Sequence, residues 1–483
     1  MKINKRNIII FISILLMTLP KYLIKIDNLS SDAIQVLGIF IGILLLWISI
    51  SITWPSLLLI LTLGLVPSLK FSSILSSAYG NTTFVFLLFT FVLTYALSKT
   101  SFLKLIANKF ITSKLASKGP WYFICSYFSA IIFIGLFISP TILFFVFLPI
   151  LDEIYETLKL EKGNSLANML MMGTVIMCGI SSGMTPIAHA FPITAMGLYQ
   201  NIYQTSIDYL SYMIVAIPTG LVLVIMVILI FKYILKPDTK ALYNINPESL
   251  KMNVTIAKSE KIVLATFIFV VLLWILPSLI ILVFNDGIIY DIFHYINSLG
   301  SAFPPLIGIV ILSIVQIDNK SIIDINEAII KGVSWPALLM CASTLALGSA
   351  IVNENIGITI YLTSTITPLI ENLNPLLMIF IFTLWAALQT NLSSNLVTAS
   401  VVTTTALAIT KGFTNINIEG LVIIIGMMAS FAFATPPAMP CVAYATSSGW
   451  TNTISMLKYG FSTMLLGVIL ATFISYPIAT IIF

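Results

Sequence analysis

Charged residues are scarce in this chain of 483 residues, because Asp, Glu, Lys and Arg together make up only 8% of it. Soluble domains carry roughly 25% charge. Hydrophobic residues account for 59% of the chain, and the mean hydropathy is +1.07. These values exclude a soluble globular domain and predict an all-α polytopic protein embedded in the lipid bilayer.

Arginine and cysteine are also rare. The single arginine is Arg6 and the lysines fall in loops, so the net charge of +5 does not indicate a nucleic-acid partner. The four cysteines lie in apolar segments without metal-site or disulfide spacing, and we interpret them as small buried side chains. The apolar stretch from Arg6 to Pro20 has no small-residue cleavage site, so we expect a retained first helix rather than a signal peptide.

Apolar stretches of about 20 residues, the length that crosses a bilayer, fill most of the chain. They predict about eleven transmembrane helices. Two longer stretches, residues 120–158 and 374–410, are each interrupted near the middle by polar residues, which favours two re-entrant helical hairpins. We call these interruptions the first tip, residues 138–141, and the second tip, residues 393–395.

A proline-containing interruption follows each tip. The first break, residues 184–189, reads Met-Thr-Pro-Ile-Ala-His, and the second break, residues 433–438, reads Phe-Ala-Thr-Pro-Pro-Ala. The two tips are 255 residues apart, measured from Ser139 to Ser394, and the threonines of the two breaks are 250 residues apart. This near-constant offset predicts a duplicated plan with one hairpin and one broken span in each half, which is typical of secondary transporters.

The distribution of basic residues favours a cytoplasmic N-terminus and an extracellular C-terminus. With eleven spans and two hairpins, only four of the 23 basic residues fall outside, namely Lys21, Lys25, Lys70 and Lys411. In this arrangement the two halves enter the membrane from opposite sides. We therefore expect inverted repeats and alternating access.

Interrupted helices expose free backbone N–H and C=O groups at mid-membrane. Helix N-termini attract anions, whereas free carbonyls with Ser, Thr and Asn oxygens can hold a small cation such as sodium. We therefore predict one binding site that is built from both tips and both breaks. Its candidate residues are Ser139, Thr141, Gly183, Thr185 and His189 in the first half, and Thr390, Ser393, Ser394, Asn395 and Thr435 in the second half.

The paired motifs resemble those of the divalent anion/sodium symporter (DASS) family of di- and tricarboxylate transporters, in the ion transporter superfamily. The matching segments are Ser394-Asn395-Leu396 and Ala434-Thr-Pro-Pro437 in the second half, and Ser139-Pro140-Thr141 and Thr185-Pro-Ile187 in the first. From the residues and the resemblance together we predict a substrate site at Ser139, Thr141, Thr185, Pro186, His189, Ser394, Asn395, Thr435, Pro436 and Pro437. A sodium site, or its remnant, is expected at Gly135, Ser139, Gly183, Thr390, Ser393 and Asn395.

The resemblance also implies a homodimer whose domains move as an elevator. The scaffold domain would comprise residues 1–118 and 262–371, and the transport domain residues 119–236 and 372–483. Residues 237–261 would form a cytoplasmic linker between the halves. The abundance of Ile, Asn and Lys, with little Arg, is typical of a bacterium with an AT-rich genome, so we expect a bacterial plasma membrane.

Departures from the family motifs bear on the coupling ion. Pro140 stands where the first tip of the family carries Asn, and Ala438 replaces the Asn that follows the second-half prolines. His189 is the only ionisable side chain expected near the site. It either packs through a hydrogen bond or, when protonated, supplies the charge that sodium supplies in symporters. Sodium-coupled symport and sodium-independent anion exchange both stay open, with exchange slightly favoured.

We expect a secondary active transporter of a di- or tricarboxylate, with sulfate or another inorganic oxyanion as the alternative substrate and no cofactor other than sodium. An anion channel is a second alternative, although no charged ring or filter sequence is visible. An intramembrane serine protease is a third, because Gly179-Ile-Ser-Ser-Gly183 has the spacing of a nucleophile elbow around Ser181. That elbow needs a strand before the serine, whereas this segment is predicted to be helical, so we do not expect an enzyme.

Overall fold

The computed structural model describes residues 5–244, 255–284, 286–361, 364–365, 374–411, 413 and 415–483. These residues are almost entirely helical, and β1 (Gln316–Ile317) and β2 (Lys320–Ser321) form a small antiparallel hairpin among them. Residues 245–254 of the expected linker, and most of residues 362–373 at the end of the expected scaffold segment, lie outside the described residues.

The helices of the first half are α1 (Lys5–Thr18), α2 (Pro20–Leu23), α3 (Ser31–Ser49), α4 (Thr53–Gly64), α5 (Phe71–Tyr79), α6 (Thr82–Ser98), α7 (Phe102–Ile111), α8 (Pro120–Gly135), α9 (Pro140–Thr157), α10 (Ser165–Gly183), α11 (Ala190–Tyr203) and α12 (Tyr209–Ile230). Short helical segments are η1 (Ala116–Lys118), η2 (Phe231–Leu235) and η3 (Lys240–Asn244).

The helices of the second half are α13 (Lys258–Val283), α14 (Gly287–Ser298), α15 (Phe303–Ile314), α16 (Ile325–Glu327), α17 (Trp335–Val352), α19 (Pro375–Leu392), α20 (Asn395–Thr410), α21 (Ile418–Ser430), α22 (Pro440–Ser447), α23 (Thr453–Leu470) and α24 (Tyr476–Ile482). Short helical segments here are η5 (Ala328–Gly332) and η6 (Ala471–Ser475).

Short polar side chains fix where several of these helices begin. The side-chain amide oxygens of Asn164 and Asn374 accept bonds from backbone N–H groups in the first turns of α10 and α19. The Asp208 carboxylate accepts such a bond at the start of α12, and the Ser394 hydroxyl oxygen accepts one at the start of α20. Such caps satisfy N–H groups that have no partner inside the helix, which matters most where no water is present.

Eight described helices, some of them continuous through two labelled segments, are long and apolar enough to cross a bilayer. The pair α14 and α15, bent by 84°, can make a ninth span. The expected number of eleven is therefore not confirmed. Among the expected spans, α1, α4 and α21 have 14, 12 and 13 residues, and each is shorter than the about 20 residues that a full crossing requires.

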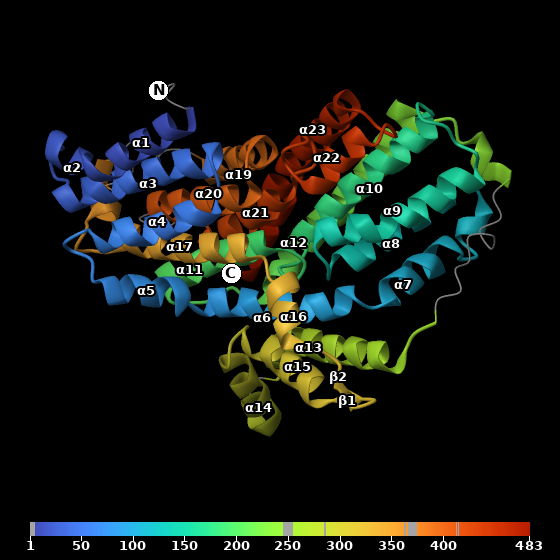
Figure 1. The fold of residues 1–483 in the computed structure, drawn as a ribbon, viewed down its shortest axis with the longest axis horizontal. Helices are drawn as coiled ribbons and strands as arrows, with labels where there is room; N and C mark the ends of the chain where they lie inside the picture. The colour runs from blue at the N-terminus through green and yellow to red at the C-terminus, as the bar shows by residue number, and fades with distance from the viewer. Residues whose placement is uncertain are drawn as a thin grey trace.

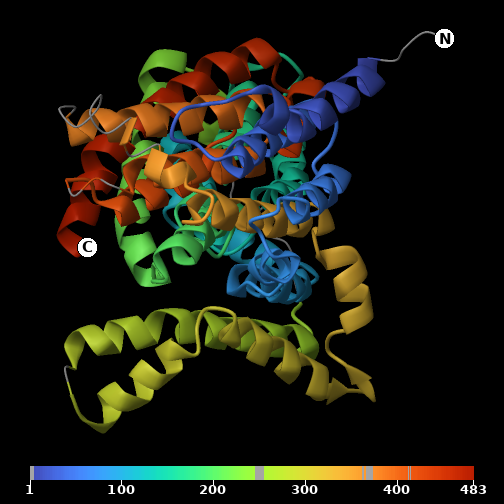
Figure 2. The same cartoon turned by 90° about the vertical axis from the view of Figure 1, so that its left-hand side faces the viewer.

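The helices form a broad body with one layer along its side. In Figure 1, α1 to α4 lie at one end of the body and α7 to α10 at the other, with α11, α12 and the helices after α19 between them. Figure 2 shows α13, α14 and α15 as a separate layer, and this layer is joined to the body through contacts of α13 and α15 with α6.

Two hydrophobic clusters form the interior. The larger cluster runs from α6 through α8 to α12 and on to α24, and the smaller one joins α3, α4 and α5. Helices α17 and α20 contribute side chains to both clusters. These two helices therefore lie at the boundary between the N-terminal helices and the rest of the body.

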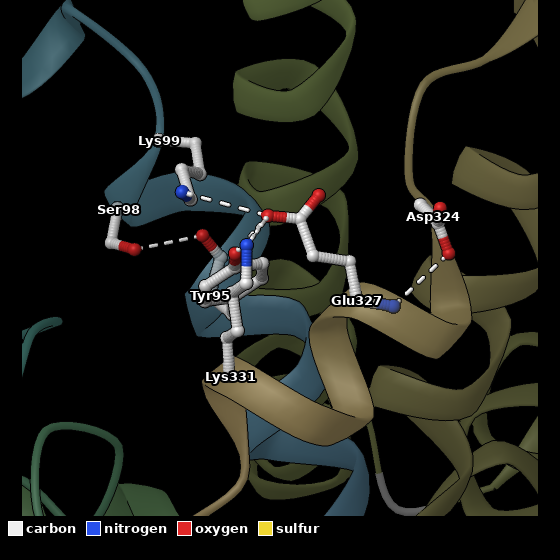
Figure 3. Close-up of polar contacts among 6 residues, drawn as sticks. All are labelled: Tyr95, Ser98, Lys99, Asp324, Glu327 and Lys331. Carbon is white, nitrogen blue, oxygen red and sulfur yellow. Dashed lines mark hydrogen bonds and ion pairs between the residues drawn. The ribbon is translucent and has the colours of Figure 1, made fainter.

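A polar contact outside the apolar core ties α6 to the segment that precedes α17 (Figure 3). The Tyr95 hydroxyl donates to Glu327 Oε1 at 2.8 Å, and Lys331 Nζ lies 3.1 Å from the same oxygen. Lys99 Nζ is 3.9 Å away. Asp324 caps α16, the short helix that contains Glu327, by accepting a bond from the Glu327 N–H.

Candidate functional site

Both predicted tips interrupt helices. Helix α8 ends at Gly135 and α9 begins at Pro140, because the proline ring disfavours a helical conformation at the residue before it. Ser139 is accordingly extended, with φ −59° and ψ 144°. At the second tip, α19 ends at Leu392 and α20 begins at Asn395. The tips are thus interrupted as the sequence predicts, and each is the turn between two neighbouring helices.

Both predicted breaks interrupt helices as well. Residues 184–189 separate α10 from α11, and residues 431–439 separate α21 from α22. The residue before each new helix has nearly the same extended backbone: His189 has φ −144° and ψ 144°, and Met439 has φ −149° and ψ 150°. The two halves therefore share the local geometry as well as the position of their breaks.

One equivalent hydrogen bond joins each tip to the break of its own half. The Thr185 hydroxyl donates to the Leu136 carbonyl at 2.5 Å. The Thr435 hydroxyl donates to the Asn391 carbonyl. Leu136 and Asn391 are 255 residues apart, which is the offset between the two tips. The threonine that precedes proline thus has the same role in both halves.

The second half adds bonds that the first half lacks. The Asn391 amide nitrogen donates to the Phe431 carbonyl at 2.9 Å, and its oxygen accepts from the Ala434 N–H at 2.8 Å. The Thr390 hydroxyl donates to the Ala429 carbonyl at 2.7 Å. These side chains satisfy backbone groups that the interruption of α21 leaves without helical partners. The second break is therefore fixed by side chains of α19.

The two breaks lie directly against each other. His189 Nδ1 is 3.3 Å from the Ser430 hydroxyl at the end of α21. Gly183 ends α10 so close to α21 that an added Cβ would lie 2.7 Å from the Phe431 ring and 2.9 Å from the Met427 carbonyl oxygen. The Gly183 carbonyl accepts from the Tyr212 hydroxyl at 2.9 Å. Together with the bonds from each tip, these contacts join all four interruptions into one centre.

Six of the predicted site residues take part in this centre. Thr185, Gly183 and His189 of the first half, and Thr390 and Thr435 of the second, make the contacts described above. Gly135 packs against Ser181 of α10, because an added Cβ would lie 2.6 Å from the Ser181 Cβ.

The remaining predicted residues line the ends of the tips and breaks. Ser139 and Thr141 are half-buried at the start of α9, and among the described residues no hydrogen bond joins the first tip to the second. Pro186 is buried, Pro436 is half-buried and Pro437 is exposed. Ser393 donates its hydroxyl to the Gln389 carbonyl at 3.0 Å and so closes the last turn of α19.

Asn395 has a buried amide oxygen without a partner. The residue is only 7% exposed, and within the part of the chain that the structure describes its Oδ1 accepts no hydrogen bond. A buried acceptor left unpaired costs about 1–3 kcal/mol. Because it lies in the first turn of α20, this oxygen is available to a bound cation or to a donor group on a substrate.

The donors around the centre are hydroxyls, amides, one imidazole and backbone groups. In the described residues no group of three or more His, Cys, Asp or Glu side chains could hold a metal ion. A cation at the second tip would therefore be held by neutral oxygens, and these suit sodium better than a transition metal.

Sequence reasoning missed two residues of this centre, Asn391 and Ser430. Asn391 lies in the polar run Leu388–Asn395, so its residue type was visible, but its role depends on the position of a segment 40 residues away. Ser430 carries no such signal. It is a single serine at the end of an apolar helix, and only the packing of α11 on α21 brings it to His189.

Interrupted helices that meet inside a helical membrane protein are the architecture of secondary transporters. A family model described as "Citrate transporter" matches residues 42–426, a range that includes both tips and the first break. The chain belongs to this citrate transporter family. The family resemblance seen in the motifs is thereby confirmed, and the protein is a transporter rather than an enzyme.

Curated relatives match along nearly the whole chain. The chain is 24% identical over 482 residues to the sodium-dependent dicarboxylate transporter SdcS of Staphylococcus saprophyticus, covering 96% of this chain and 89% of the relative. It is 23% identical over 481 residues to the protein of the same name in Staphylococcus aureus, covering 94% and 88%. An uncharacterized transporter of Haemophilus influenzae is 26% identical over 477 residues, covering 98% and 97%.

Proposed function

We propose that the protein carries a di- or tricarboxylate across a bacterial plasma membrane, bound where the two tips meet the two breaks. The observation that carries this proposal is the hydrogen-bonded centre itself, in which four interrupted helices are joined without any Lys or Arg side chain. Helix N-termini supply the attraction for anions in such a site. The names of the staphylococcal relatives support a dicarboxylate over an inorganic oxyanion.

The substrate carboxylates would be held by the N-terminal turns of α9 and α20 and by the threonines of the breaks. Ser139 and Thr141 would contribute in the first half, and Ser394 and Asn395 in the second. Thr185 and Thr435 donate their hydroxyl protons to backbone carbonyls, so their oxygens are left to accept and their main role is to fix the site. Pro186, Pro436 and Pro437 keep the neighbouring backbone out of a helix.

We place one sodium ion at the second tip, among Thr390, Ser393 and Asn395. The unpaired Asn395 oxygen supports this position, and so does the sodium dependence named for the relatives. The first half offers Gly135, Ser139 and Gly183, but Pro140 has no amide oxygen at the position that corresponds to Asn395. Symport with sodium at the second tip is therefore better supported than the exchange that the first motif favoured.

His189 would act as a packing residue in this scheme. Its ring packs against Phe191 at an interplanar angle of 49°, with the centroids 3.8 Å apart, and its Nδ1 faces the Ser430 hydroxyl. Those contacts support the hydrogen-bonded alternative over a charged imidazolium, because the partners that the described residues supply are neutral.

Alternation between inward-facing and outward-facing states would follow from inverted repeats. The N-terminus would lie in the cytoplasm and the C-terminus outside. The equivalent bonds of Thr185 and Thr435, 250 residues apart, support the duplication. We propose that the expected transport domain, residues 119–236 and 372–483, moves as an elevator against the scaffold domain of a homodimer. The re-entrant arrangement of the two tips belongs to the same proposal.

Uptake by the purified protein in proteoliposomes tests the function. We expect saturable uptake of labelled succinate or citrate that requires an inward sodium gradient and shows counterflow. Replacement of sodium by choline should abolish it. Saturable sulfate uptake that excess succinate leaves unchanged would contradict the carboxylate assignment, and flux without saturation or counterflow would indicate a channel.

A further inference from the structure

Three buried hydroxyl groups on α20 have no hydrogen-bond partner in the described part of the chain. They belong to Ser400, Thr403 and Thr404, whose exposed fractions are 0%, 0% and 1%. Most buried polar side chains are hydrogen-bonded, and a group of three unpaired hydroxyls in one helix is a departure from that pattern. The cluster begins five residues after Asn395, beyond the second tip, and is separate from the binding centre.

Other hydroxyls of the same helix are satisfied locally. The Thr398 hydroxyl donates to the Ser394 carbonyl at 3.1 Å, and the Thr410 hydroxyl donates to the Ala406 carbonyl at 2.8 Å. A bond to the carbonyl four residues earlier is the usual solution for Ser and Thr inside a helix. Ser400, Thr403 and Thr404 do not use it, so their hydroxyls are directed away from the α20 backbone.

These three residues share one face of α20, at a junction with two other helices. Their spacing of three and four residues places them side by side on the helix surface. Helix α20 packs against α11 and α17. At Gly348 of α17, an added Cβ would lie 3.0 Å from Leu198 of α11 and 4.0 Å from the Thr404 hydroxyl oxygen. Of the three hydroxyls, that of Thr404 therefore lies beside a point where α17 has no side chain, and α20 also packs against α19 and α21.

The chemistry of the three groups favours water over a cation. A cation would use only the oxygen lone pairs and would leave three O–H donors unpaired, whereas water both donates and accepts. The α20 backbone is helical throughout this region, so it supplies no free carbonyls for a cation. Neighbouring side chains on a helix are about 5–6 Å apart at Cβ, and this separation allows a water with bonds of about 2.8 Å to bridge two hydroxyls.

We propose that Ser400, Thr403 and Thr404 form an internal water-binding site at the junction of α11, α17 and α20. Buried waters typically make about three bonds to polar groups that the protein leaves unpaired. Such a site gives α20 a water-mediated contact with α17, across the boundary between the two hydrophobic clusters. It does not depend on the identity of the transported substrate.

X-ray hydroxyl-radical footprinting of the full chain in lipid nanodiscs tests the site, because the radicals form in place from bound water. The reporter is Leu407, which follows Thr403 and Thr404 on the same face and is 0% exposed. Leu223 of α12, also 0% exposed, is the matched control. We expect oxidation of Leu407 well above that of Leu223. Equal, background oxidation of both leucines would overturn the proposal.

Substitution of the three hydroxyls provides the second arm. In the variant S400A/T403V/T404V, oxidation of Leu407 should fall to the level of Leu223. The melting temperature of T403V and of T404V should fall below that of the wild type, because bonds to bound water are lost. A rise in the melting temperature of both variants would mean that the hydroxyls are dry and would refute the site, since removal of an unpaired polar group stabilises a protein.

Discussion

The two tips occupy equivalent positions, but they are held in different ways. In the second half, Thr390 and Asn391 reach across to the broken end of α21 and bond to its backbone. The residues 255 positions earlier are Gly135 and Leu136, which have no polar side chain. In the part of the chain that the structure describes, one side-chain bond, from Thr185, joins the first tip to its break, and Gly135 packs closely against α10.

This difference indicates that the two halves contribute differently to the binding site. The second tip has amide and hydroxyl oxygens to spare, one of which, in Asn395, is unpaired. The first tip has proline at that position, and proline has no side-chain oxygen. We infer that ligand chemistry is concentrated in the second half, while the first half chiefly maintains the geometry that presents it.

Asn391→Leu should have the largest effect on stability and transport. It replaces Asn391 with leucine, the residue that the first half has at the equivalent position, Leu136. The Phe431 carbonyl and the Ala434 N–H, both in fully buried residues, would lose their partners. Each buried group left unpaired costs about 1–3 kcal/mol. We expect a large drop in melting temperature and loss of uptake in proteoliposomes. Leu136→Met, which keeps the backbone carbonyl that Thr185 uses, should remain near wild type.

Wild-type stability of Asn391→Leu would show that the bonds to the second break are dispensable. The contrast between the two tips would then have no energetic meaning.

Gly135→Ala should disturb the first tip through packing. The new Cβ would lie 2.6 Å from the Ser181 Cβ, and overpacking of this kind costs about 1–3 kcal/mol. Thermal unfolding in detergent should show the loss, and Ser181→Gly in the same chain should restore part of it. Additive losses in the double variant would contradict the assigned contact, because residues in contact are not expected to behave independently.

Thr185→Val and Thr435→Val compare the two equivalent bonds directly. Each removes one hydrogen bond, which contributes about 1 kcal/mol. Among the described residues the first tip has no second side-chain bond to its break, whereas the second tip keeps those of Asn391 and Thr390. We therefore expect Thr185→Val to lower the melting temperature of the substrate-free protein more than Thr435→Val. A larger loss of melting temperature in Thr435→Val than in Thr185→Val would contradict the inference that the first tip depends more on its threonine bond.

The smallest effect is expected from Glu327, which lies in the contact between α6 and the segment before α17 (Figure 3). The hydrogen bond from Tyr95, and then the bond and charge of Lys331, lower the pKa of the Glu327 carboxyl. A lowered pKa in the folded state stabilises the protein above the unfolded pKa, and this contribution is lost as the pH falls through the folded pKa. The melting temperature of the wild type should therefore decrease slightly as the pH falls into the acid range. In Glu327→Gln this decrease should be smaller, while uptake stays unchanged.

The sequence predicted the interruptions because their causes are local. Proline at 140, 186 and 436 has no N–H for a continuing helix and disfavours one, although α9 runs through Pro149, and Ser394 caps the helix that follows the second tip. The near-constant offsets between the halves then indicated that the two tips and the two breaks belong to one duplicated arrangement. The family followed from the same motifs.

Other features depend on contacts between distant segments and could not be predicted. The role of Asn391 requires knowing that α21 ends beside α19, and no periodicity records that. The number of full spans is not confirmed among the described residues, because helices such as α4, with 12 residues, end earlier than their apolar composition indicates.

The most direct test of the account is the thermal shift of the purified protein by succinate, measured in sodium and in choline, for wild type and Asn395→Ala. A ligand that binds the folded state raises the melting temperature by mass action. We predict a shift for wild type in sodium only, and none for Asn395→Ala in either salt, with the unliganded melting temperature close to wild type. An equal succinate shift in choline, or an undiminished shift in Asn395→Ala, would contradict a neutral second tip that holds sodium and carboxylate together.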